Sequence, residues 1–198
     1  MSPWSRYALV LVDLQQDFWT SAVAATSPEL PDRVTALLEH SRAEGLMVVH
    51  VRARFRPDRS DWMARYRLRN WIPCIDGTPG VETLPFAAEL PGEAVVIKHS
   101  FDGFLGTDLD EVLAGRGIRG LLIAGLVTST CVLFTASTAT QRGYLVSVVS
   151  DCCSDREEPH RATLAAYPFV FDTVLSHEIA GRRDGWDADL DRMGTLGP

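Results

Sequence analysis

The sequence lacks the features that mark nucleic-acid-binding and membrane proteins. Its 26 acidic residues outnumber the 19 Lys and Arg residues, and the formal net charge is −7. Phosphate binding needs net or clustered positive charge, so a nucleic-acid partner is not expected. No apolar run reaches the ~20 residues that a helix needs to span a bilayer. We therefore expect binding to neither nucleic acid nor membrane.

Targeting and disulfide signals are also missing. The stretch from Met1 to Tyr7 is polar and leads directly into an apolar segment, so we expect no signal peptide. The four cysteines form no disulfide pattern, and Cys152 and Cys153 are adjacent and poorly placed to bond each other. Reduced thiols and a cytoplasmic location are the expected consequence.

Lysine is almost absent. Of the 19 Lys and Arg residues, eighteen are arginines and only Lys98 is a lysine. Arginine cannot give up its proton and presents a rigid fork, whereas lysine offers a compact charge whose pKa can be tuned. Composition alone leaves chance and a requirement for an amine equally open. The place of Lys98 in the predicted fold favours the requirement.

Short segments rich in Val, Ile and Leu alternate with helix-like stretches. Because these segments do not alternate apolar with polar residues, they indicate strands buried on both faces of a parallel sheet. The predicted strands are 7–12, 47–51, 94–97, 120–124, 145–149 and 169–171, and the predicted helices are 31–44, 107–114, 129–142 and 158–166. This order predicts one α/β domain over residues 1–198, a three-layer α/β/α sandwich around a mostly parallel sheet.

An arginine-rich segment at about residues 52–91 interrupts the alternation, with no clear strand. A long irregular segment within a compact domain usually carries function or forms an interface. If it is a lid, Arg52, Arg54 and Arg56 would hold a carboxylate or phosphate of the substrate. The alternative is an exposed face paired with the excess of acid, or an oligomer contact.

Three reactive side chains follow three different predicted strands. Asp13 follows the first strand, Lys98 follows the third, and Cys131 opens the helix after the fourth. Ligands bind beyond the carboxyl ends of such strands, so the three should meet at one edge. A helix start and a nearby ammonium would lower the pKa of the thiol. Asp13 would take the thiol proton and pass it to a leaving amine, which makes an acyl-transfer site without a metal.

Three sequence blocks in this order also carry a family resemblance. They are DLQQDF at 13–18, KHSFDGFLGT at 98–107 and GLVTSTCV at 125–132. With these blocks the chain resembles the isochorismatase-like cysteine hydrolases over most of residues 7–178. The resemblance implies the isochorismatase-like hydrolase fold and a catalytic triad of Asp13, Lys98 and Cys131.

The resemblance implies further features of the site. A cis peptide would fall at Leu126–Val127, and the amides of Val127 and Cys131 would form the oxyanion hole. Pockets of the family often use aromatic residues after the first block. The aromatic substrate contacts expected here are Phe18, Trp19, Phe104 and Phe134.

Two branches of the family differ from this sequence. Nicotinamidases carry an Asp and two His residues as a metal site after the second strand, where this chain has His50 followed by arginines. We therefore expect no metal and no cofactor, with His50 structural. Isochorismatases cleave a vinyl ether and typically lack the cysteine, so Cys131 favours cleavage of an amide, ureide or carbamoyl-type C–N bond through a thioester. Vinyl ether cleavage and noncatalytic binding remain alternatives.

The expected partner is a small-molecule substrate, bound by a homo-oligomer that is a dimer or tetramer. Cys131 together with the arginine cluster predicts a substrate with a C–N bond and an anionic group. Specificity is expected to depend on residues 18–30 and 52–90.

Overall fold

A computed structural model, which describes residues 2–195, contains a six-stranded sheet in the order β3-β2-β1-β4-β5-β6, with every pair parallel. The strands are β1 (Tyr7–Val12), β2 (Met47–Ala53), β3 (Ala94–Lys98), β4 (Gly120–Leu126), β5 (Leu145–Ser154) and β6 (Asp172–Val174). The strand order reverses at β1, which lies between β2 and β4. The carboxyl ends of β1 and β4 therefore form the switch point at which sheets of this kind bind ligands.

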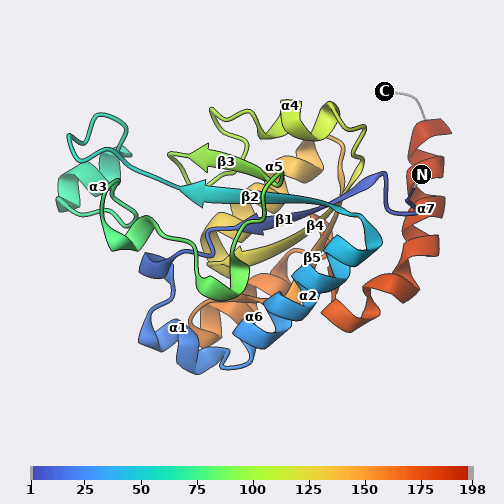
Figure 1. Cartoon of the computed structure of the whole chain (residues 1–198), viewed down its shortest axis with the longest axis horizontal. Coiled ribbons are helices and arrows are strands. Elements are labelled where there is room, and N and C mark those ends of the chain that lie inside the picture. Colours follow the sequence, from blue (N-terminus) through green and yellow to red (C-terminus); the bar gives the residue numbers. More distant parts are fainter. Residues whose placement is uncertain (1, 196–198) are drawn as a thin grey trace.

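Helices flank the sheet on both faces. They are α1 (Ser21–Thr26), α2 (Leu30–Glu44), α3 (Ala64–Arg69), α4 (Leu109–Ala114), α5 (Leu133–Gln141), α6 (Glu157–Ala166) and α7 (Ile179–Thr195). Helices α4 and α5 lie on one face and α2 on the other, which confirms the predicted three-layer arrangement (Figure 1). Helix α3 lies beyond the tip of β2, whereas α7 lies at the opposite end of the sheet (Figure 1). No helix within residues 2–195 is long and apolar enough to cross a membrane.

The central strands form the core of the sheet. All residues of β1 and all residues of β4 are buried. Their apolar runs without alternation are thus explained by the helices on both faces, as expected for parallel strands. Several of the buried polar side chains lie where β1, β3 and β4 end.

Several elements differ from the predictions. Helices α1, α3 and α7 are not predicted, and the segment at 52–91 holds the end of β2 and α3, so it is not wholly irregular. The predicted strand at 169–171 is wrong. Those residues belong to a turn in which the N–H groups of Val170 and Phe171 donate to the carbonyl of Tyr167, and the strand begins at Asp172. The predicted helix at 129–142 begins with a π-helical turn, η4 (Thr128–Val132), before α5.

A glycine allows β4 to end against β1. Gly125 has a φ of +131°, and a Cβ atom there would lie 2.0 Å from the carbonyl oxygen of Val12. No other residue fits this approach. One residue further on, the Leu126–Val127 bond is a cis peptide, as the family resemblance implies. The chain then enters η4, so Cys131 follows closely on the end of β4.

Candidate active site

A buried ion pair joins the ends of β1 and β3. Asp13 is 0% exposed and Lys98 is 1% exposed, and Lys98 Nζ lies 2.7 Å from Asp13 Oδ2. Lys98 also donates to the carbonyl of Ser100 at 2.8 Å, while Asp13 Oδ1 accepts from the N–H of Ala53 at 2.9 Å. Charges survive such burial only when they are paired and hydrogen-bonded, as these are.

The thiol of Cys131 belongs to the same cluster. Burial raises the pKa of this thiol, the Asp13 carboxylate raises it further, and the Lys98 ammonium lowers it, so that the net shift is upward. Lys98 thus lowers the pKa of the thiol as expected, but burial and Asp13 together raise it by more. Cys131 is 4% exposed, and its desolvation is the largest of these contributions. The resting site therefore holds a protonated thiol beside a carboxylate.

The Asp13 carboxylate has an oxygen available for that proton. Its Oδ2 atom lies 2.7 Å from Lys98 Nζ, and the Asp13 carboxylate is also in hydrogen-bond contact with the Cys131 thiol. Burial lowers the pKa of Lys98, but Asp13 and Cys131 raise it more strongly, so that its pKa is raised overall and the amine stays charged. Asp13 is thus placed as a base and Lys98 as a fixed cation.

A cavity of about 130 Å³ opens beside these three residues. Two of them, Lys98 and Cys131, form part of its wall. The remaining lining residues are mostly aromatic or aliphatic: Phe18, Ala53, Phe55, Met63, Tyr66, Pro73, Ser100, Phe101, Val127 and Thr130. A small apolar cavity with a few convergent polar groups is the usual form of a small-molecule site.

Of the four predicted aromatic contacts, one lines the cavity. Phe18 lines the cavity, whereas Trp19 and Phe104 do not. Phe104 is 3% exposed and belongs to the hydrophobic core. Phe134 is 46% exposed and stacks on Phe101, a wall residue, so that it stands behind the wall.

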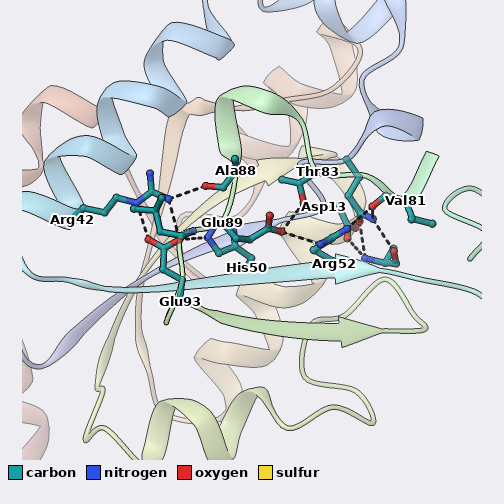
Figure 2. Close-up of polar contacts among 12 residues, drawn as sticks. Asp13, Arg42, His50, Arg52, Val81, Thr83, Ala88, Glu89 and Glu93 are labelled. Carbon is teal, nitrogen blue, oxygen red and sulfur yellow. Dashed lines mark hydrogen bonds and ion pairs between the residues drawn. The ribbon is translucent and has the colours of Figure 1, made fainter. Parts of the chain in front are cut away.

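None of the three predicted arginines lines the cavity. Arg52 donates to Glu89 at 3.0 Å and to the carbonyl of Val81 at 2.7 Å (Figure 2). Arg54 pairs with Asp76 at 2.6 Å, and Arg56 is exposed. An arginine clamp on the substrate therefore has no contact to support it.

Sequence reasoning missed much of the cavity wall. Met63 precedes α3 and Tyr66 lies within it, on a helix without buried residues and hence without apolar periodicity. Phe55, Pro73 and Phe101 come from loops. The available signal was the occurrence of apolar and aromatic residues within the arginine-rich segment.

Val127 and Cys131 both line the cavity, at the two ends of the turn that follows β4. The carbonyl of Val127 accepts from the N–H groups of Thr130 and Val132, which holds the turn closed. An oxyanion hole made by the amides of Val127 and Cys131 remains a prediction at this position.

His50 belongs to a buried polar network on β2. Its Nε2 lies 2.8 Å from Glu93 Oε2, and Arg42 donates to Glu93 at 2.7 Å (Figure 2). Burial raises the pKa of Glu93, but Arg42 and His50 lower it to about 2. Within residues 2–195 no group of three or more His, Cys, Asp and Glu residues is arranged to hold a metal ion. His50 thus holds Glu93 within this network.

Gln15 ties the arginine-rich segment to Asp13. It is 0% exposed, and its Nε2 donates to the carbonyls of Ala53 and Val81 at 2.9 and 2.8 Å. The N–H of Ala53 donates to both Gln15 Oε1 and Asp13 Oδ1. Gln15 thus positions the peptide group that orients Asp13.

Replacing Gln15 with glutamate should test this positioning. The variant keeps an acceptor for Ala53 but loses the donor, and it adds negative charge beside Asp13. Because a second carboxylate favours the protonated form of Asp13, the acid limb of kcat/KM should move to higher pH. Activity should fall roughly tenfold at neutral pH. Gln16→Glu, at the neighbouring exposed position, is the control, and an equal shift in both variants would refute the role.

Comparison with known proteins assigns the chain to a family. Residues 7–179 match the model of the isochorismatase domain. The chain belongs to the isochorismatase family. All three residues of the buried cluster, Asp13, Lys98 and Cys131, lie inside the matched region.

Several known proteins are similar to this chain over most of their length. The uncharacterized family protein YddQ of Bacillus subtilis is 30% identical over 184 residues, which cover 86% of this chain and 96% of YddQ. Maleamate amidohydrolase of Pseudomonas putida is 28% identical over 181 residues, 87% of this chain and 84% of the relative. The crystal structure of N-carbamoylsarcosine amidase from Thermoplasma acidophilum has a TM-score of 0.75 at 27% identity, covering 86% of this chain and 96% of the other.

Proposed function

We propose that this isochorismatase-family hydrolase cleaves a C–N bond of a small amide, ureide or carbamoyl compound through a thioester on Cys131. The observation that carries the proposal is the convergence of a thiol, a carboxylate and an ammonium at one cavity. Two similar proteins, the maleamate amidohydrolase and the N-carbamoylsarcosine amidase, are named for C–N cleavage, which supports the same class of reaction.

In the first half-reaction, Asp13 accepts the proton from Cys131 as the sulfur attacks the carbonyl carbon. The Lys98 ammonium stabilises the thiolate and keeps Asp13 oriented. The predicted oxyanion hole, formed by the Val127 and Cys131 amides, would stabilise the tetrahedral intermediate. Asp13 then gives the proton to the leaving nitrogen, the C–N bond breaks, and an amine or ammonia leaves with a thioester behind.

In the second half-reaction, water attacks the thioester carbon and Asp13 accepts its proton. The C–S bond breaks, the acid product leaves, and the proton returns to the thiol. Together, the two half-reactions use one water molecule to break one C–N bond. A protonated thiol at rest fits this order of steps, because Asp13 can activate the thiol in the same step in which the thiol attacks.

The test is a screen of small amides, ureides and carbamoyl compounds for ammonia or amine release, followed by rapid quenching and intact-mass analysis. We expect a covalent adduct of the acyl group on the peptide that contains Cys131. Isochorismate is the counter-substrate. If the enzyme turns over isochorismate alone, and Cys131→Ala does so equally well, the reaction is vinyl ether cleavage and the proposal fails.

Removal of metal ions should leave the enzyme unchanged. The proposed steps use only Asp13, Lys98 and Cys131, and the histidine on β2 is engaged by Glu93. Dialysis against a strong chelator should therefore alter neither turnover nor melting temperature. Activity that is lost on dialysis and restored by zinc or iron would contradict this expectation.

A further inference from the structure

The cavity also indicates what kind of molecule the enzyme accepts. We propose that the substrate is a small uncharged amide whose acyl group is a flat ring or a short apolar chain. This inference rests on the proposed C–N hydrolysis and differs from the anionic substrate that the arginine cluster predicts.

The first support is the chemistry of the wall. Apart from Lys98, Ser100, Thr130 and Cys131, its side chains are apolar or aromatic. Most of these come from η1 (Gln16–Phe18), from the segment between the end of β2 and Pro73, which includes α3, and from the loop after β3. Tyr66 contacts Phe101 with ring centroids 6.0 Å apart. Such a surface gains free energy from covering a ring or alkyl group and loses it from desolvating a charge.

The second support is the absence of a cation for the substrate among the lining residues. Lys98 is the only ionic side chain in the described wall, and it is already engaged by Asp13, Ser100 and Cys131. Burial raises the pKa of the Tyr66 hydroxyl, and Arg69 opposes this shift without lining the cavity. A substrate carboxylate would therefore lie in the cavity without a counter-charge, which is unfavourable.

The third support is size. The cavity volume of about 130 Å³ is close to the ~150 Å³ of an apolar cavity that binds benzene. An acyl group of that size fills the space between the aromatic wall and the thiol.

A matched pair of amides tests the charge preference directly. Maleamate and cis-2-butenamide share a carbon skeleton, and the second carries a methyl group where the first carries a carboxylate. We expect kcat/KM to favour cis-2-butenamide by roughly 100-fold, because the carboxylate has no partner in the cavity. Benzamide should also be a substrate. Binding to the Cys131→Ser protein, measured by calorimetry, should show the same order independently of turnover.

A variant that introduces a positive charge into the cavity wall extends the test. Met63→Arg places a cation at the half-buried rim of the cavity and should raise the preference for maleamate roughly tenfold. Leu68→Arg is the matched control. It adds the same charge on α3 at a position that is 82% exposed and outside the cavity wall, so it should leave the preference unchanged.

The outcomes separate this inference from the proposed function. Preferred turnover or binding of maleamate by the wild-type protein would overturn the neutral-substrate inference while leaving cysteine amide hydrolysis intact. The absence of both binding and turnover for every neutral amide would overturn it as well. Turnover of the neutral amide that persists in Cys131→Ala would instead overturn the proposed mechanism.

Discussion

Replacing Cys131 with alanine is expected to reduce turnover of any C–N substrate by at least about 10⁴-fold, because covalent catalysis has no substitute for the missing nucleophile. The fold should be retained, since the change removes one sulfur atom from a cavity wall. Steady-state ammonia release and circular dichroism would measure the two effects. Thioester formation, followed by intact mass, should disappear completely.

Cys152→Ala is the matched control for this substitution. Cys152 is also buried, but it lies on β5 and does not line the cavity. It should lower the melting temperature through lost packing and leave kcat nearly unchanged. Near-normal turnover by Cys131→Ala would show that the thiol is not the nucleophile.

Lys98→Arg should lose well over tenfold in kcat, which is more than about 1.4 kcal/mol of transition-state stabilisation. The single lysine lies at 1% exposure with its Nζ 2.7 Å from Asp13 and 2.8 Å from the carbonyl of Ser100. A planar guanidinium is larger and cannot occupy that position without displacing Asp13 or Cys131. Turnover and the pH profile should therefore both change although the charge is kept.

The control for Lys98→Arg is the reverse exchange at the surface. Arg116→Lys, at an exposed position, should leave both turnover and stability unaltered. If Lys98→Arg behaved in the same way, the single lysine would be a coincidence of composition. Lys98→Met, which leaves Asp13 unpaired in a buried site, should instead lose stability as well as activity.

The sequence predicted the parts of the fold that depend on buried apolar runs. Strands β1 to β5 begin where the patterning places them, and β1 and β4 are buried along their whole length. The edge strand β6 has the sequence Asp-Thr-Val, of which only Val174 is buried, so it carries no such signal. The aromatic run before it is apolar for a different reason, since Phe171 packs on Tyr167 while Phe169 is 80% exposed.

The candidate catalytic residues were predictable because their positions depend on topology alone. Asp13, Lys98 and Cys131 lie at or just after the ends of β1, β3 and β4, and the ends of parallel strands lie at the same edge of the sheet. The cavity wall was not predictable in this way. The orientation of Arg52 depends on Glu89, which is 37 residues away in the chain, and only the folded segment shows that the pair is formed.

The hydrogen bonds of Gln15 mark off the segment that would select the substrate from the residues that would carry out the proposed reaction. A single side chain holds the carbonyls of Ala53, at the end of β2, and of Val81, so the two ends of the stretch between them stay together. The stretch between them carries α3 and much of the wall, but neither Asp13, Lys98 nor Cys131. Exchanging that stretch changes a loop whose ends stay together, at little cost in closure entropy. The segment can therefore be exchanged, by design or in evolution, to change substrate selectivity while Asp13, Lys98 and Cys131 stay in place.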